Sequence, residues 1–340
     1  MGHSSTPLAL TLGDPAGIGP DVTLLAFAAR SHEAIPPFVL IGDETVLAER
    51  AKMLGLSIPI AKISVLADAH RVFPDALPVL PTGLSGAVTA GRPNAETMAA
   101  VTRSIETAVA LVQGGEARAV ITNPVSKSTL YQAGFEFPGH TEYLAALAAG
   151  DGPAPHPVMM LVAGPFKVVP TTIHIPLKDV ERTLTRELLH ETIKITDRDL
   201  RRFFGYARPR LAVSGLNPHA GEAGSLGREE IDTIEPVIAA ARTEGLDVSG
   251  PFPADTLFHE AARERYDAAI CMYHDQALVP FKTLAFEEGV NVTLGLPFIR
   301  TSPDHGTAFD IAGTGRANPR SLIEALRLAS AMSETAADEA

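Results

Sequence analysis

The sequence has 340 residues, of which 46% are hydrophobic and 20% are charged, a globular composition with enough chain for two domains of ordinary size. Its formal net charge of −12 argues against general affinity for nucleic acid or anionic membrane, because both need an excess of Lys and Arg. An anionic ligand must therefore be bound by local cations.

The sequence also predicts the compartment in which the protein works. No apolar stretch approaches the roughly 18 to 20 residues of a membrane span, and the first ten residues lack the charged and apolar blocks of a signal peptide. The single cysteine, Cys271, excludes a disulfide framework and a paired-cysteine metal site. We therefore expect a soluble cytoplasmic protein.

Strand and helix patterns alternate from the N-terminus onward. Residues 7–12 and 36–43 are apolar runs, and each is followed by a segment of helical period, at 21–32 and 44–55. A third helix is predicted after Asn94, a possible N-cap, and before the glycine pair at 114–115. Its apolar residues recur at steps of three or four: Met98, Val101, Ile105, Val109 and Val112.

The remaining strand candidates are mostly apolar throughout, as expected for strands covered by helices on both faces. They are residues 117–124, 157–164, 167–177, 210–218, 266–274 and 290–297. The order predicts an α/β class built of α/β/α sandwiches, and the length suggests two lobes. Ligands of open α/β sheets bind beyond the carboxyl ends of the strands.

Three histidines stand at such strand ends. In residues 167–177 the strand period points His174 away from the apolar side, and His219 and His274 follow two further apolar strands. Three imidazoles can bind a divalent ion and leave coordination positions open for substrate. The spacings are too long for a local metal signature, so hydrogen-bonded loop histidines are the alternative.

A set of anion-binding candidates accompanies these histidines. His140 and Thr141 open a predicted helix, whose N-terminal N–H groups favour an anion, and Lys and Arg side chains can add charge-assisted hydrogen bonds. The further candidates are Lys282, Asn291 and Arg300. The alternative is a solvated helix residue for Lys282 and a loop ion-pair partner for Arg300.

Two glycine-rich stretches complete the candidates. Residues 10–22 follow a strand and precede a helix, but their glycines match neither the dinucleotide-binding fingerprint nor a P-loop. Residues 304–319 contain His305 and small residues that would let the backbone approach a flat ligand. Either stretch alone could be a tight turn.

Seven motifs together resemble the 4-hydroxythreonine-4-phosphate dehydrogenase family of pyridoxal phosphate biosynthesis. They are GDPAGIGPDV, TNPVSKSTL, FPGHTEYLA, LNPHAGEAGSLGREE, PFPADTLF, YHDQALVPFK and SPDHGTAFDIAGTGRANP, in this order along nearly the whole chain. The first and the last also resemble the wider isopropylmalate and isocitrate dehydrogenase group.

The resemblance implies an isopropylmalate-dehydrogenase-like fold with a cleft between two α/β/α lobes, one formed by residues 1–134 plus 291–340 and the other by residues 135–290. It implies a homodimer with shared active sites. It also implies NAD or NADP and one divalent metal ion, Zn, Mg or Co. The implied reaction oxidises 4-(phosphooxy)-L-threonine at C3, and the β-keto acid so formed loses CO2.

The resemblance also assigns residues. The metal ligands would be His174, His219 and His274, at least one of them from the partner subunit. Asp255, Lys282 and a metal-bound water are the candidate proton acceptors, which the sequence does not rank. The substrate contacts would be His140, Thr141, Lys282, Asn291 and Arg300. The more distant relatives imply cofactor contacts at Gly306, Thr307, Asp310 and Gly313.

Three other functions are compatible with these residues. The nearest is a dehydrogenase of 4-phospho-D-threonate or 4-phospho-D-erythronate, whose substrates carry a hydroxyl in place of the amine; one buried polar partner could separate them. A zinc-dependent hydrolase would use the three histidines without nicotinamide. A sensor that only binds a phosphorylated metabolite would need neither the three histidines nor the whole of residues 304–319.

Overall fold

The computed structural model describes residues 6–137, 139–150 and 152–338. These described residues divide into two compact units, one within residues 1–157 and 296–338 and the other formed by residues 158–295. The sequence also predicts a discontinuous first lobe, but it ends the N-terminal part of that lobe at residue 134, before α6 (His140–Ala149). The helix over residues 140–149 belongs to the first unit because Tyr143, Leu144 and Ala145 pack in that unit's apolar core.

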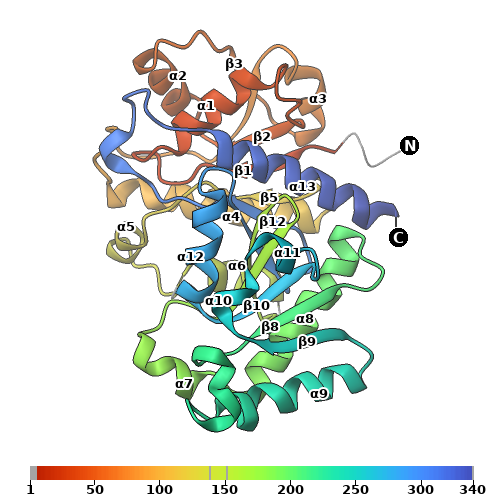
Figure 1. The fold of residues 1–340 in the computed structure, drawn as a ribbon. Coiled ribbons are helices and arrows are strands. Elements are labelled where there is room, and N and C mark those ends of the chain that lie inside the picture. The colour runs from red at the N-terminus through yellow and green to blue at the C-terminus, as the bar shows by residue number, and fades with distance from the viewer. Residues whose placement is uncertain (1–5, 138, 151, 339–340) are drawn as a thin grey trace. The chain divides into compact units, whose positions relative to one another are not determined.

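The first unit is built on a parallel sheet of order β3-β4-β2-β1-β5-β12. Its strands are β1 (Leu8–Thr11), β2 (Phe38–Gly42), β3 (Ile60–Lys62), β4 (Leu77–Pro81), β5 (Val120–Ile121) and β12 (Arg300–Pro303). Its helices are α1 (Gly19–Ala29), α2 (Glu44–Met53), α3 (Ala69–Val72), α4 (Met98–Gln113), α5 (Lys127–Gln132), α6 (His140–Ala149) and α13 (Arg320–Asp338). Figure 1 shows them along the chain.

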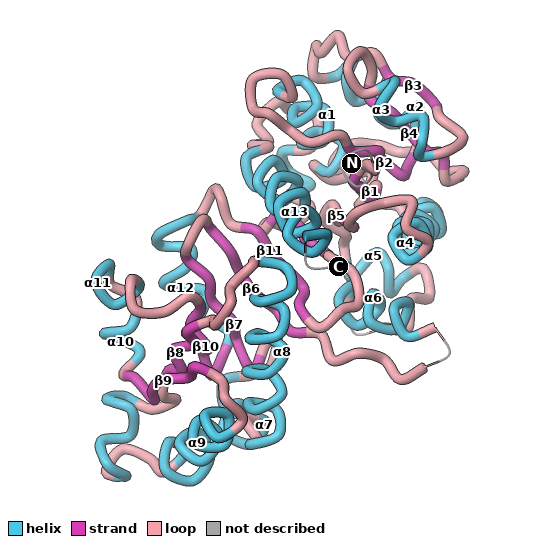
Figure 2. Tube along the Cα trace, turned by 90° about the vertical axis from the view of Figure 1, so that its right-hand side faces the viewer, coloured by secondary structure: helices cyan, strands magenta, loops and turns pink. Residues whose placement is uncertain are grey.

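Helices cover both faces of this sheet. Helix α4 packs on β1 and β2, and α13 packs on β12 and β5; Figure 2 shows the two helices on opposite sides of the strands. The predicted amphipathic helix is confirmed, because four of its five predicted apolar residues are buried. Asn94 caps the short turn before it, accepting a hydrogen bond from the Glu96 N–H at 3.0 Å.

The second unit has the sheet order β11-β6-β7-β10-β8-β9. Its strands are β6 (Val158–Ala163), β7 (Phe166–Thr172), β8 (Arg210–Ser214), β9 (Asp247–Phe252), β10 (Ala268–Tyr273) and β11 (Val290–Leu294). Its helices are α7 (Val180–Thr183), α8 (Arg186–Phe204), α9 (Glu235–Thr243), α10 (Ala254–Leu257), α11 (Glu260–Arg263) and α12 (His274–Ala285).

In the second unit, strand β6 runs opposite to the other five strands. Strands β6 and β7 are antiparallel, joined by a two-residue turn that starts at Gly164 with φ of 53°. Strand β11 is antiparallel to β6, and the other pairs are parallel. Helix α12 packs on β7 and β10, while α8 packs on β6, β7 and β11. Figure 2 shows α8 and α12 on opposite faces of these strands.

These elements confirm the predicted α/β class with helices on both faces of each sheet. Each of the apolar runs predicted as strands overlaps one. Across the residues that the structure describes, no helix is long and apolar enough to cross a membrane.

Candidate functional site

The first unit brings Arg300 and Thr122 together. Strand β12 pairs in parallel with β5, with Arg300 opposite Val120 and Thr301 opposite Ile121. This register places the Arg300 guanidinium beside the Thr122 hydroxyl, to which it donates from Nη2 at 2.6 Å and from Nε at 3.2 Å. Arg300 is only 5% exposed, and it lies on a strand and not in a loop. The side chain is therefore a buried, oriented cation.

His140 lies beside this cation at the first residue of α6. Burial, followed by the charges of Arg300 and Lys127, lowers the pKa of His140 to about 3. Burial lowers the pKa of Arg300 to about 10. At neutral pH the imidazole is therefore uncharged while the guanidinium keeps its charge. The His140 Nε2 atom is buried and has no hydrogen-bond partner among the described residues.

Lys127 adds a second cation that the sequence reasoning did not select. A Cβ atom placed on Gly139 would lie 3.4 Å from Lys127 Nζ, so this ammonium lies at the N-terminus of α6. Thr141 is the second residue of that helix. The helix start, the two cations and the neutral imidazole are the candidate groups for binding an anion, and we call them the anion-binding set; the Glu142 carboxylate also lies at this helix start. Lys127 is the first residue of α5. Its place in the motif TNPVSKSTL was the only feature of the sequence that pointed to a functional role for it.

The second unit brings two of the three predicted metal ligands together. Strands β7 and β10 are parallel neighbours, with Thr172 opposite Tyr273. His174 follows the first strand and His274 follows the second, so that their ring centroids are 5.5 Å apart. The predicted strand alternation is wrong for His174, because β7 ends at Thr172. The His174 ring lies beside His274 because both residues follow the ends of neighbouring parallel strands, and the alternation of side chains along a strand does not determine its position.

The surroundings of His274 suit a metal ligand. Its Nδ1 is hydrogen-bonded to Asp275 Oδ1 at 2.7 Å, which leaves Nε2 for coordination, and such carboxylate partners orient metal-binding imidazoles. A pocket of about 220 Å³ lies against both histidines. Its lining residues are Ile173, His174, Ile175, Leu177, Val180, Tyr273, His274 and Asp275.

His219 lies elsewhere in the second unit. It is exposed and belongs to the turn Pro218–Gly224 that follows β8. Within the described parts of the chain, no group of three His, Cys, Asp or Glu side chains is placed to hold a metal ion. One chain therefore brings together two predicted ligands, and a third ligand from the partner subunit stays a prediction.

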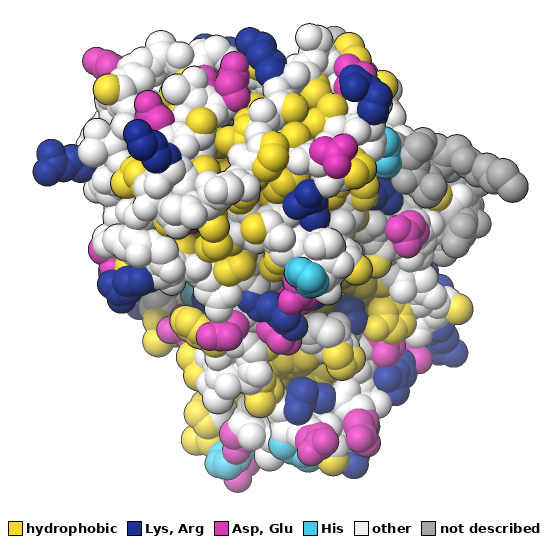
Figure 3. Space-filling view, turned by 90° about the horizontal axis from the view of Figure 1, so that it is seen from above, with side chains coloured by type: hydrophobic (Ala, Val, Ile, Leu, Met, Phe, Trp, Pro, Cys, Tyr) yellow, Lys and Arg dark blue, Asp and Glu magenta, His cyan; other side chains and the backbone are white. Residues whose placement is uncertain are grey.

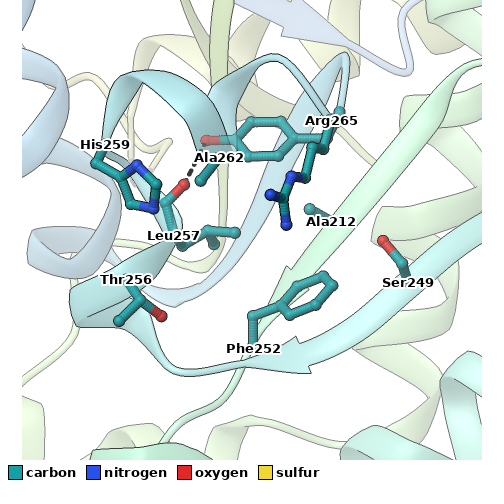
Figure 4. Close-up of a pocket in the computed structure, with 9 residues that line it drawn as sticks. Ala212, Ser249, Phe252, Thr256, Leu257, His259, Ala262 and Arg265 are labelled. Carbon is teal, nitrogen blue, oxygen red and sulfur yellow. Dashed lines mark hydrogen bonds between the residues drawn. The ribbon is translucent and has the colours of Figure 1, made fainter.

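The other predicted residues of this unit lie on three different elements. Lys282 is on α12, with Nζ 5.6 Å from the centre of the Phe286 ring, and the half-buried Asn291 is on β11. Asp255 is the exposed second residue of α10. The pocket beside this helix, about 250 Å³ in volume, is lined by other residues, and Figure 4 shows Phe252 and Arg265 pointing into it. A role for Asp255 stays a prediction.

The two glycine-rich stretches meet in the first unit. The Ile18 N–H donates to the Thr307 carbonyl at 2.9 Å. A Cβ on Gly17 would lie 2.8 Å from that same oxygen, so only glycine allows this approach. The Gly313 N–H donates to Asp21 Oδ1 at 2.7 Å. Thr307 and Gly313 thus lie against the N-terminal turn, while Gly306 and Asp310 are exposed.

A buried ion pair fixes this arrangement. The Arg50 guanidinium bonds to the Asp21 carboxylate, and the two side chains are 2% and 0% exposed. Arg50 also donates to the carbonyls of Gly17 at 2.8 Å and Pro15 at 3.1 Å. Asp14, in the same turn, is fully buried, and burial raises the pKa of its carboxyl. Neither Arg50 nor Asp14 was predicted: Arg50 stands in an ordinary helical stretch, and the motif that contains Asp14 was considered only for its glycines.

Known proteins are similar to this chain over nearly its whole length. Residues 33–329 match the sequence model of the family described as pyridoxal phosphate biosynthetic protein PdxA. The chain belongs to this family. A 4-hydroxythreonine-4-phosphate dehydrogenase of Bradyrhizobium diazoefficiens is 57% identical, covering 97% of this chain and 98% of the relative. One from Xanthobacter autotrophicus is 56% identical over 97% and 95%.

A solved structure agrees with this assignment. The crystal structure of a 4-hydroxythreonine-4-phosphate dehydrogenase from Klebsiella pneumoniae is 39% identical, covers 97% of this chain and 100% of its own, and has a TM-score of 0.87. The family predicted from the motifs is confirmed, and with it the expectation of an oxidoreductase. The roles of the individual site residues stay predictions.

Proposed function

We propose that this PdxA family member oxidises 4-(phosphooxy)-L-threonine at C3 with NAD or NADP and one divalent metal ion. The product, 2-amino-3-oxo-4-(phosphooxy)butanoate, then loses CO2 to give 3-amino-2-oxopropyl phosphate for pyridoxal 5'-phosphate biosynthesis. The observation that carries the proposal is 57% identity, over 97% of the chain, with a relative named for this substrate. The two units supply groups that suit this chemistry.

The anion-binding set of the first unit suits a substrate phosphate. On the face shown in Figure 3, acidic and basic side chains are interspersed, so attraction for an anion must come from close cations. Arg300 is buried and charged, and its guanidinium is oriented by Thr122. His140 stays neutral, so its buried Nε2 can donate or accept a hydrogen bond. Thr141, Lys282 and Asn291 are the further proposed substrate contacts.

The paired histidines of the second unit suit a divalent ion such as Zn, Mg or Co. Neutral imidazoles are common metal ligands, and they leave the ion its full charge. His174 and His274 supply two, and His219, from one subunit or the other, would supply the third. When bound, the ion would supply a Lewis acid for the C3 hydroxyl, and the nicotinamide would supply an acceptor for the hydride that leaves the C3 carbon.

The chain's own residues orient the substrate and remove its proton. Asp255 and Lys282 are the proposed proton acceptors, and a distance within hydrogen-bond reach of the C3 hydroxyl decides between them. For the nicotinamide cofactor we propose Gly306, Thr307, Asp310 and Gly313. Contact between this segment and the N-terminal turn supports that assignment, since it fixes the backbone over which a flat ligand could lie.

A homodimer with shared active sites accords with exposed apolar side chains along α12 and in the histidine pocket. Val279 on α12 is 63% exposed, Phe286 just beyond it is 72% exposed, and Leu177 in the histidine pocket is 71% exposed. Val279 and Phe286 are seven residues apart and share one helix face with Lys282. A second copy of the chain would remove this apolar surface from water. The expected location is the cytoplasm.

One assay tests the proposed function. Purified protein is treated with a chelator and resupplied with Zn, Mg or Co, and absorbance at the NADH band is followed with each phosphorylated substrate and with NAD or NADP. We expect metal-dependent reduction of the nicotinamide with 4-(phosphooxy)-L-threonine. Faster turnover of 4-phospho-D-threonate or 4-phospho-D-erythronate would overturn the substrate assignment. Phosphate release without nicotinamide would overturn the reaction type.

A further inference from the structure

The turn that carries His219 has an unusual backbone. Residues 219–223 all have positive φ, with values of 53° at His219, 52° at Ala220, 76° at Gly221, 45° at Glu222 and 54° at Ala223. Side chains of L-residues disfavour this left-handed region, which non-glycine residues visit singly as a rule. Four of these five residues are not glycine. Contacts from outside the turn must therefore hold it in place.

The Glu230 carboxylate supplies contacts of this kind, to residues 216 and 217 and to Gly221. It is 1% exposed, and its Oε1 accepts hydrogen bonds from the N–H groups of Leu216 and Asn217, both at 2.8 Å. Its Oε2 accepts from the Asn217 side-chain amide at 3.0 Å. The same oxygen lies so close to Gly221 that a Cβ there would overlap it. One buried carboxyl group therefore binds the residues before His219 and packs against the middle of the turn.

A second buried side chain connects this turn to the paired histidines. Gln276, two residues after His274, is 7% exposed. Its Nε2 donates to the Gly215 carbonyl at 2.8 Å, and its Oε1 accepts from the Met272 N–H at 2.7 Å. The Thr172 hydroxyl donates to the Met272 carbonyl at 2.8 Å. Segments adjoining all three predicted ligands are thus joined by one buried hydrogen-bond network.

We propose that Glu230 is a positioning residue for metal binding: its carboxylate holds the left-handed turn that presents the His219 imidazole. The inference rests on the proposed function, in which His219 is a metal ligand. A buried carboxylate suits this task because it accepts several N–H groups at once, and leaving those groups unpaired is costly. Groups that orient a metal ligand affect affinity although they never touch the ion.

Cobalt(II), added as the metal alone to the metal-free full-length protein, tests the inference. Its visible absorption reports the ligand geometry, and competition with a chromogenic chelator gives the dissociation constant. The test variant is Glu230→Gln, which keeps the shape but replaces one acceptor oxygen with a donor facing the Asn217 amide. Glu235→Gln is the matched control, because Glu235 is exposed on the helix that follows.

We expect Glu230→Gln to bind cobalt(II) at least about tenfold more weakly, with an altered visible spectrum, and the control to match the wild type. If Glu230→Gln does not fold, Asn217→Ala removes one donor to the same carboxylate and should shift affinity in the same direction. Thermal unfolding without metal identifies the variants that fold. A changed visible spectrum shows that the ligand geometry has changed, whereas a loss of stability alone would leave the spectrum of the bound ion as in the wild type.

Two results would overturn different claims. Wild-type affinity and spectrum in a folded Glu230→Gln or Asn217→Ala variant would refute the positioning role while leaving the proposed function intact. Unchanged affinity and spectrum in His219→Ala would instead remove the imidazole from the metal site. In that case the proposed ligand set fails, and the inference about Glu230 fails with it.

Discussion

Breaking the buried ion pair between Arg50 and Asp21 should destabilise the first unit strongly. In Arg50→Met the Asp21 carboxylate stays buried with a backbone hydrogen bond from Gly313, and the Gly17 carbonyl loses its guanidinium donor. Removing one partner of a buried pair typically costs about 3–5 kcal/mol, because the remaining charge is uncompensated. We expect a loss in that range for the unfolding of this unit.

Urea denaturation followed by circular dichroism measures this loss. Arg71→Met is the control, because Arg71 is in an exposed ion pair with Asp68, and it should change stability by less than about 1 kcal/mol. Adding Asp21→Asn to Arg50→Met should recover part of the loss, since the buried charge is then gone. A loss below about 1 kcal/mol for Arg50→Met, or no recovery in the double variant, would refute the reasoning.

Four further outcomes are expected. His140 has a pKa of about 3 in the folded state and about 6.5 when unfolded, so the unfolded chain binds more protons between these values and stability falls as pH drops from 6.5 to 3. His140→Gln should lessen this fall, as pH-dependent denaturation would show. Arg300→Met should raise the substrate KM about 10- to 100-fold with a smaller change in kcat, because charged hydrogen bonds contribute about 1.5–3 kcal/mol. Asp275→Asn should weaken divalent-ion binding about tenfold in a chelator competition, because His274 loses its orienting carboxylate. Phe286→Asp should shift a dimer toward monomer in sedimentation, because a charge would enter an apolar contact.

Each of these outcomes can be contradicted directly. An equally steep loss of stability in His140→Gln would assign the acid sensitivity to other groups. A change confined to metal affinity in Arg300→Met would count against its role with the phosphate. Wild-type cobalt(II) binding in Asp275→Asn would show that His274 needs no such partner, and an unchanged mass for Phe286→Asp would place the subunit contact elsewhere.

The sequence was informative where one local pattern determines structure. The period of Met98, Val101, Ile105 and Val109 predicted α4, and the apolar runs predicted strands such as β1 and β10. Short elements were missed because their patterns are weak: β3 has three residues, none of them buried. The motifs were long enough to identify the family without any structure.

Contacts between distant segments were beyond the reach of local patterns. His174 lies close to His274 because β7 and β10 are neighbouring strands. The number of residues between the two histidines does not reveal which strands are neighbours. Lys127 affects His140 only because the start of α5 lies near the start of α6. Glu230 and Gln276 look like ordinary polar residues in the sequence, and only burial distinguishes them. The left-handed turn at His219 carries no composition signal apart from its glycines.

The discontinuous first unit has a consequence for synthesis on the ribosome. Strand β12 and helix α13 complete its sheet and cover β5, yet they are translated after the whole of the second unit. Residues 158–295 emerge from the ribosome before β12 and α13 do. The second unit can therefore fold first, while the N-terminal strands still lack the β12 strand and the α13 helix that complete their unit. In a chain that ends at residue 295 and has been released from the ribosome, the second unit should resist protease and the N-terminal residues should remain sensitive.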